Sequence, residues 1–171
     1  MYGHIAYIGL GSNLQDPHEQ LRRAFADLEG LPDTHVVAKS SLYRSAPIGC
    51  PRLPDMTSQP DFVNAVAKIS TALKPQELLK ALLDIEHQHG RERSVRNAPR
   101  TLDLDVLLYD EVQLHEHGLT IPHPQMHLRA FVLQPLLEIS PDVSIPGVGQ
   151  AKESLCACED QVLEKLCDVV R

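Results

Sequence analysis

The segment Arg100–Asp110 carries the residues whose types and spacing most clearly suggest chemistry. It reads Arg-Thr-Leu-Asp-Leu-Asp-Val-Leu-Leu-Tyr-Asp, so apolar residues alternate with two acids, Asp103 and Asp105. Alternation with period two predicts a β-strand on which both carboxylates project from the face opposite the apolar side chains. Carboxylates roughly 6.5–7 Å apart on such a strand repel each other unless a cation lies nearby. All-oxygen ligands suit Mg²⁺, which keeps its other positions for water and phosphate, so the segment predicts a metal–polyphosphate site.

A basic segment lies directly before this strand in an otherwise acidic chain. Residues 91–100 contain four arginines and one glutamate, a local charge of +3, whereas the whole chain has a net charge of −7. Alone, an Asp-x-Asp strand is most often the solvated face of a half-buried sheet, and a basic segment is most often a solvated loop. Because the two are adjacent, we interpret them together as an anion clamp beside a metal site.

The totals indicate one globular domain covering residues 1–171. The chain is 43% hydrophobic and 23% charged, which is ordinary for such a domain. The acidic balance argues against a nucleic-acid partner, and no apolar run is long enough to predict a membrane partner. The N-terminus lacks the features of a leader, so we expect a cytoplasmic protein whose four cysteines are free thiols. The sequence is compatible with a monomer.

Periodicity predicts the order strand, helix, strand, strand, helix, strand. The expected elements are strands at 2–10, 35–43, 61–71 and 100–110, and helices at 16–29 and 75–89. This is the split βαβ pattern, so we predict an α+β fold with a ferredoxin-like βαββαβ core. Its antiparallel sheet would carry helices on one face and leave the other face for the substrate site.

Other segments give weaker expectations. Gly9–Asn13 should end the first strand in a tight turn, and it lacks the third glycine of a dinucleotide fingerprint. Ser45–Pro60 is a long proline-containing loop, which in a compact domain suggests a function or disorder. Met126–Ile139 looks helical with an interruption at Pro135, and Gln150–Val170 looks like an amphipathic C-terminal helix.

Several single side chains are unusual for their predicted positions. Asn64 lies in mid-strand, where asparagine is disfavoured, and Glu86 lies near a helix C-terminus, where an acid opposes the dipole. We therefore expect a partner for each, a cation or hydrogen-bond donor in the case of Glu86. A Pro-His-Pro frame fixes His123. Two further histidine pairs lack a third ligand at zinc spacing and are expected at the surface, namely His87 with His89 and His115 with His117.

Six sequence blocks occur in the order found in one enzyme family. They are Tyr7–Leu14, Tyr43–Pro47, Gln59–Ala65, Glu86 with Gly90-Arg91, Pro99–Asp105, and Ile121–Pro124 with Arg129–Phe131. On these residues the chain resembles the 6-hydroxymethyl-7,8-dihydropterin pyrophosphokinases of folate biosynthesis. The likeness runs from about residue 4 to about residue 142, and the block Pro-Arg-Thr-Leu-Asp-Leu-Asp is its most specific part.

The resemblance implies an ATP- and Mg²⁺-dependent transfer of pyrophosphate. The hydroxymethyl oxygen of the pterin would attack the β-phosphorus of ATP, and AMP would leave. Asp103 and Asp105 would bind two Mg²⁺ ions, in keeping with phosphoryl-type transfer as a matter of positioning and charge neutralisation. Arg91 and Arg100 would clamp the phosphates, with assistance from Arg93.

The resemblance also implies the residues that bind each substrate. The remaining nucleotide-binding positions would be Glu86, Val106, Thr120, His123 and Arg129. The pterin-binding positions would be Ser45, Ala46, Ile48, Phe62, Asn64 and Phe131. Within the second set, the two phenylalanines would sandwich the pterin and the Asn64 amide would meet its polar edge.

The chain departs from the best-known members at four points. Residues 96–98 replace a loop tryptophan, the arginine segment is one residue shorter, residues 50–58 lengthen the preceding loop, and Pro124 replaces a common tyrosine. The missing tryptophan bears on loop closure over the pterin. None of the four changes touches the two acids.

Two other functions would use some of the same residues. A ferredoxin-like module that only senses a nucleotide or metal would not require both acids, both clamp arginines and Asn64 together. A metal-dependent phosphohydrolase would use the same acids but needs no pterin pocket, so Phe62, Asn64 and Phe131 argue against it.

Overall fold

A computed structural model describes residues 3–12, 17–45, 62–89, 102–116, 118–158, 161 and 163–165, with the backbone alone for Pro17, Ser45, Phe62 and Glu164. Within it, six strands form one antiparallel sheet. They are β1 (His4–Ser12), β2 (Thr34–Lys39), β3 (Tyr43–Ser45), β4 (Phe62–Thr71), β5 (Asp103–Tyr109) and β10 (Leu163–Lys165). The order is β10–β3–β4–β1–β5, and β2 pairs with β4 beyond the end of β3.

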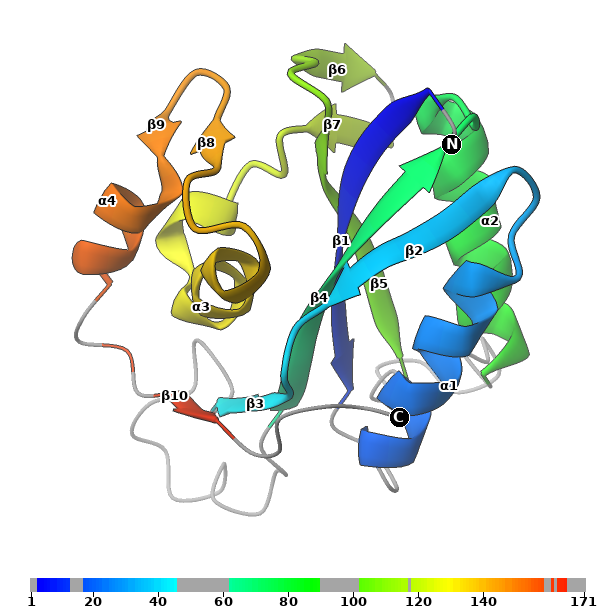
Figure 1. The fold of residues 1–171 in the computed structure, drawn as a ribbon, viewed down its shortest axis with the longest axis horizontal. Helices are drawn as coiled ribbons and strands as arrows, with labels where there is room; N and C mark the ends of the chain where they lie inside the picture. Colours follow the sequence, from blue (N-terminus) through cyan, green and yellow to red (C-terminus); the bar gives the residue numbers. More distant parts are fainter. Residues whose placement is uncertain are drawn as a thin grey trace.

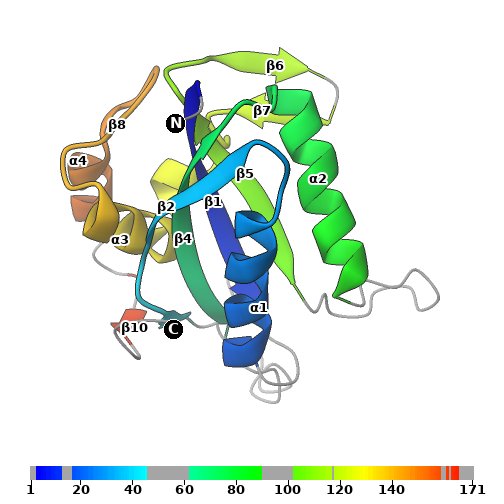
Figure 2. The same cartoon turned by 45° about the vertical axis from the view of Figure 1, so that its right-hand side comes forward.

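Helices lie on both sides of this sheet (Figures 1 and 2). Helices α1 (Pro17–Glu29) and α2 (Pro75–Gln88) cover one face, and α3 (Ala130–Ile139) with α4 (Ala151–Cys156) covers part of the other. The α1–α2 side encloses one hydrophobic core, and the α3–α4 side encloses a second. The α+β class is confirmed. The expectation of helices on one face only is wrong, because apolar residues such as Val66 also point to the second face and need cover.

Strand β5 contains a β-bulge that its sequence pattern conceals. In the pairing with β1, Ile8 lies opposite Val106 but Tyr7 lies opposite Leu108, so Leu107 is the extra residue. Both Leu107 and Leu108 join the second core, whereas Val106 belongs to the first. The predicted alternation therefore holds through Val106 and fails at Leu108.

Two predicted element boundaries differ at the sheet. Strand β1 does not end at Gly9 but continues through Gly11 to Ser12, paired on both sides. The strand expected over residues 35–43 divides at Ser40. The Ser40 N–H donates to the Val66 carbonyl at 2.9 Å, and the Val66 N–H donates to Ser40 Oγ at 2.9 Å. Between β2 and β3, a side-chain oxygen thus replaces one backbone acceptor in the ladder to β4.

The C-terminal half also differs from expectation. Pro135 lies inside α3, and the break occurs earlier, at the extended residue Arg129 that separates α3 from the 3₁₀ helix η2 (Met126–Leu128). Within the expected helix over residues 150–170, the described residues are helical only in α4, and Leu163–Lys165 pair with β3 as β10. Four short strands make two hairpins, β6 (Leu114–Glu116) with β7 (Leu119–Ile121) and β8 (Ser144–Ile145) with β9 (Gly149–Gln150).

In the described part of the chain, no helix combines the length and apolar character needed to span a bilayer. Cys156 and Cys158 are free thiols, as expected, while Cys50 and Cys167 lie outside the described residues.

One histidine predicted at the surface is buried instead. The His89 side chain, at the end of α2, is only 1% exposed. Its Nε2 lies 2.6 Å from Oδ2 of Asp27, and its Nδ1 lies 2.8 Å from Oε1 of Gln20, both on α1. Its neighbour in sequence, His87, is exposed as expected, as is His115, and His117 lies outside the described residues. His89 therefore joins the two helices of the first face.

We predict that His89→Ala lowers the free energy of unfolding by about 1–3 kcal/mol, because Asp27 and Gln20 each lose a buried hydrogen-bond partner. Urea denaturation followed by circular dichroism measures this. His87→Ala, an exposed histidine on the same helix, is the matched control and should change little. Equal effects from the two substitutions would show that the interhelical contact contributes nothing.

Candidate active site

The two acids of β5 project from the second face, as the alternation predicts. Asp103 is half-buried and Asp105 is exposed. Between them, Leu104 turns to the opposite side and is buried in the first core. In the pairing with β1, Asp103 lies opposite Gly11 and Asp105 lies opposite Gly9. Neither neighbour on β1 has a side chain, and this lets the Leu107 side chain lie against Gly9 and the Asn64 amide lie against Gly11.

A row of residues crosses the sheet from the first acid to Asn64. Gly11 pairs with Asp103 on one side and with Asn64 of β4 on the other. A Cβ atom at Gly11 would lie 3.1 Å from Oδ1 of Asn64, so only glycine lets that amide lie against β1. Asn64 is 95% buried, with 5% exposed. The two glycines that suggested a turn instead lie within β1, between β4 and β5. Glycine inside a strand is the sequence signal that could have indicated the close approach of other side chains.

His123 is held beside Asp105 by backbone contacts. The backbone N–H of His123 donates to the carbonyl of the bulge residue Leu107 at 3.0 Å. The backbone N–H of Gln125 donates to Nδ1 of the His123 ring at 3.2 Å. Because Nδ1 is an acceptor, the neutral ring carries its proton on Nε2. Burial lowers the pKa of His123, and the charge of Arg129 lowers it further, while the Asp105 carboxylate opposes both effects. These three side chains therefore influence one another electrostatically.

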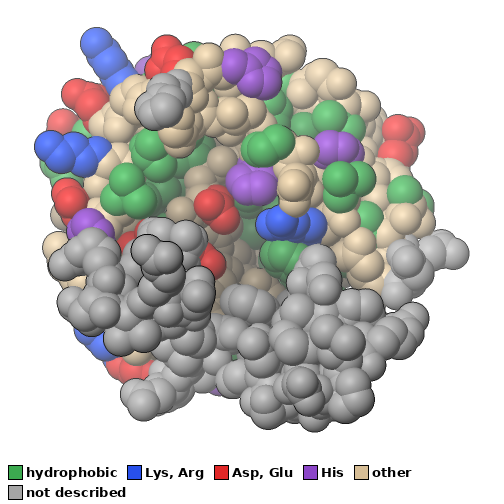
Figure 3. Space-filling view, turned by 180° about the vertical axis from the view of Figure 1, so that it is seen from behind, with side chains coloured by type: hydrophobic (Ala, Val, Ile, Leu, Met, Phe, Trp, Pro, Cys, Tyr) green, Lys and Arg blue, Asp and Glu red, His purple; other side chains and the backbone are tan. Residues whose placement is uncertain are grey.

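Arg129 links this charged group to an aromatic ring. Its guanidinium carbon lies 5.5 Å from the centre of the Phe131 ring, and its Nη2 donates to Oε1 of Gln125 at 2.5 Å. A guanidinium at this range is attracted to the ring face. Figure 3 shows acidic, histidine and basic side chains gathered around a hollow on this side of the molecule. Gln125, which contacts both His123 and Arg129, was not predicted, and nothing in its sequence pattern indicates it.

Three predicted nucleotide-binding residues lie apart from this group. Glu86 is buried on α2, and its Oε2 accepts the Leu104 N–H at 2.7 Å, which is the donor that its helix position suggested. This hydrogen bond anchors β5 at Leu104, the residue between the two acids. Val106 points into the first core, and Thr120 is half-buried on β7.

The remaining predicted residues can be followed only in part. Arg91, Arg93, Arg100, Ala46 and Ile48 lie outside the described residues. The backbones of Ser45 and Phe62 pair with each other where β3 meets β4, two residues along from the pair formed by Tyr43 and Asn64. Among the described residues no group of three or more His, Cys, Asp or Glu side chains could hold a metal ion. Any ion at the Asp103–Asp105 pair would take few ligands from this part of the protein.

Comparison with known proteins points to one family. The family model of 7,8-dihydro-6-hydroxymethylpterin-pyrophosphokinase matches residues 7–141. A 2-amino-4-hydroxy-6-hydroxymethyldihydropteridine pyrophosphokinase of Haemophilus influenzae is 50% identical over 161 residues, covering 94% of this chain and 97% of its own. The protein of the same name from Pseudomonas aeruginosa is 46% identical over 160 residues, covering 94% and 95%.

Solved structures share the fold at low identity. A chain described as HPPK-DHPS in complex with substrates superimposes with a TM-score of 0.71 at 13% identity. The match covers 92% of this chain but only 43% of that one. This chain therefore spans less than half of the longer protein, and the likeness supports the fold alone.

We predict that Asp105→Asn lowers the pKa of His123 still further, since the carboxylate that favours the protonated ring is lost. Arg129→Gln should raise that pKa, because a repelling charge is removed. Proton NMR titration of the ring in chelator-treated protein measures both shifts. Glu111→Gln, which changes an exposed acid beyond the end of β5, is the control. An unchanged or raised pKa in Asp105→Asn would contradict the arrangement described above.

Proposed function

The chain belongs to the 7,8-dihydro-6-hydroxymethylpterin-pyrophosphokinase family, and we propose that Asp103 and Asp105 are the centre of its active site. As a member of this family it is an enzyme that transfers pyrophosphate to the hydroxymethyl group of 6-hydroxymethyl-7,8-dihydropterin in folate synthesis. ATP is the proposed donor and AMP the proposed leaving product.

The observation that carries this proposal is the pair of carboxylates on one face of β5. Asp103 is half-buried and Asp105 is exposed, so both acids can provide oxygen ligands to a metal ion that also binds phosphate. The donor set suits Mg²⁺, and we propose that both acids hold two such ions. Bound there, Mg²⁺ would neutralise phosphate charge and orient the transferred group. Glu86 holds the strand between the acids, so their spacing does not depend on the ions.

The nucleotide is proposed to lie beside His123 and Arg129. The neutral His123 ring has its Nδ1 occupied by Gln125, so its Nε2–H is available to donate to a phosphate oxygen. Arg129 supplies a fixed positive charge nearby. By family match, Arg91, Arg93 and Arg100 clamp the phosphates, and Glu86, Val106 and Thr120 complete the nucleotide site. For Glu86 and Val106 this contribution is indirect, through the positioning of β5.

The pterin is proposed to lie between Asn64 and Phe131. The Asn64 amide offers one acceptor and two donors, which match the edge of a heterocycle. Phe131 is half-buried at the start of α3, where its ring can stack on a flat ligand. By family match Phe62 supplies the opposite ring, and Ser45, Ala46 and Ile48 contact the pterin through their backbones.

We further propose that the core is of the ferredoxin-like type, which the antiparallel order β2–β4–β1–β5 supports. Family membership favours the enzyme over a binding module or a phosphohydrolase. The monomeric state and the cytoplasmic location stay predictions.

We predict that Asp103→Ala and Asp105→Ala each lower turnover at least about a hundredfold, because charge neutralisation and orientation at the phosphates are lost. AMP release with ATP, Mg²⁺ and pterin measures the loss. Asp84→Ala, an exposed acid on α2, should keep full activity. Circular dichroism should be unchanged in all three variants, since neither β5 acid belongs to a hydrophobic core. Retained turnover in either β5 variant would refute the assignment.

A second prediction concerns the aromatic wall. Phe131→Ala should weaken pterin binding by about tenfold through loss of one stacking face, and ATP binding by much less. Titration calorimetry with each ligand separates the two. Val37→Ala, which changes an exposed apolar residue on β2, is the control. Equal losses for both ligands would exclude a specific stacking role.

A further inference from the structure

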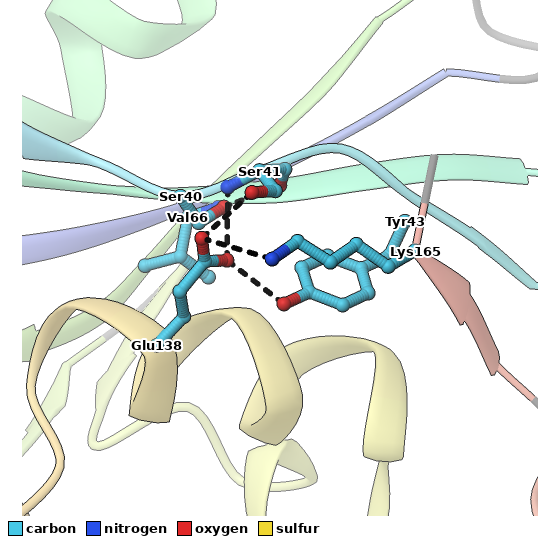
Figure 4. A network of polar contacts seen from close by, with 6 residues as sticks. All are labelled: Ser40, Ser41, Tyr43, Val66, Glu138 and Lys165. Atoms are coloured by element: carbon cyan, nitrogen blue, oxygen red, sulfur yellow. Dashed lines mark hydrogen bonds and ion pairs between the residues drawn. The ribbon is translucent and has the colours of Figure 1, made fainter. Parts of the chain in front are cut away.

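The carboxylate of Glu138 joins helix α3 to the sheet at a point remote from the two acids (Figure 4). One oxygen accepts the Ser41 N–H at 2.9 Å and the Tyr43 hydroxyl at 2.8 Å, and the other accepts the Ser41 hydroxyl at 2.6 Å. Nζ of Lys165 lies 4.0 Å from the second oxygen. Burial alone would raise the pKa of Glu138, but the hydrogen bonds from Ser41 and Tyr43 and the charge of Lys165 lower it. The group is therefore ionised at neutral pH.

These partners belong to the short segment that places β3 on the sheet. The Ser40 side-chain oxygen replaces one backbone acceptor in the ladder to β4, and β3 begins at Tyr43. Tyr43 pairs with Asn64 in the next rung. Glu138 thus accepts a hydrogen bond from the side chain of Tyr43, the cross-strand neighbour of Asn64. It also accepts one from the backbone N–H of Ser41, just before β3. A shift of this carboxylate would be transmitted directly to the strand pair formed by β3 and β4.

The same helix carries Phe131 at its other end. Residues 130–139 form one continuous helix, so a fixed Glu138 also fixes the direction in which Phe131 is presented. The Gln161 side chain holds the start of the helix, since its Oε1 accepts the Ala130 N–H at 2.9 Å and its Nε2 donates to the Leu128 carbonyl at 2.8 Å. Gln161 and Lys165 both lie in the C-terminal segment, which therefore contacts α3 at each end.

We propose that Glu138 is a positioning residue for the pterin, which together with Gln161 sets the separation between the sheet side of the pterin site, at Asn64, and the helix side, at Phe131. This inference rests on the proposed function, because it takes those two residues as the walls of the pterin site. It gives the C-terminal segment, which carries no family motif, a role in substrate binding. The partners of Glu138 are Ser41, Tyr43 and Lys165, none of which belongs to the proposed nucleotide site, so we expect ATP binding to change less than pterin binding.

The test measures pterin and ATP affinities separately by titration calorimetry of the full chain. Glu138→Ala should weaken 6-hydroxymethylpterin binding about tenfold, because small displacements of a binding wall are costly, while Mg-ATP binding changes less than about twofold. Glu138→Gln, which keeps the shape and some of the hydrogen bonds, should recover part of the pterin affinity. Gln161→Ala acts at the opposite end of α3 and should also weaken pterin binding about tenfold. Because its partners Leu128 and Ala130 flank Arg129, it should lower ATP affinity as well. The pterin loss in this variant keeps the inference testable if Glu138→Ala fails to fold.

Gln134→Ala is the matched control, since Gln134 is exposed on α3 one turn before Glu138. It should leave both affinities unchanged. Equal losses of pterin and ATP affinity in Glu138→Ala, or unchanged pterin affinity in Glu138→Ala or Gln161→Ala, would overturn the positioning role while leaving the proposed function intact. Failure of the unmodified chain to bind pterin at all would overturn the proposed function and this inference with it.

Discussion

The mutual repulsion of two carboxylates on one strand face is the constraint on which the rest of the structure depends. Asp103 and Asp105 project from the same side of β5, and such a pair is stable only where solvent or a cation offsets its charge. Among the described residues, Asp105 is exposed and Asp103 is half-buried, and the buried Glu86 fixes the intervening Leu104 N–H. The strand is therefore held in place while its acids stay accessible, which suits a site that must receive charged phosphates.

The two faces of the sheet divide stability and function unequally. The first face packs against α1 and α2, and His89 joins the end of α2 to α1. The second face is divided between a core under α3 and α4 and the proposed active site. Because α3 both packs on this face and carries Phe131, its placement links the second core to the proposed pterin site. The carboxylate of Glu138 is one of the polar contacts that hold that placement.

The sequence patterns correctly predicted features that depend on residues close together in the chain. The alternation around Asp103 gave the strand and the direction of both acids, and the helix position of Glu86 correctly indicated a nearby donor. Features that depend on contacts distant in sequence were missed. The bulge at Leu107 requires knowledge of β1, the burial of His89 requires α1, and the strand β10 exists only because β3 leaves an edge for it. Gly11 carried a usable signal, since glycine within a strand marks close approach, but its partner Asn64 lies on another strand.

Product analysis with ATP, Mg²⁺ and 6-hydroxymethyl-7,8-dihydropterin tests the central claim most directly. AMP and the pterin diphosphate should form in equal amounts, and neither should form when the pterin or Mg²⁺ is omitted. Formation of ADP instead would show transfer of a single phosphoryl group. Release of inorganic phosphate without a pterin product would show hydrolysis. Either result would contradict the assignment of the Asp103–Asp105 pair to pyrophosphoryl transfer.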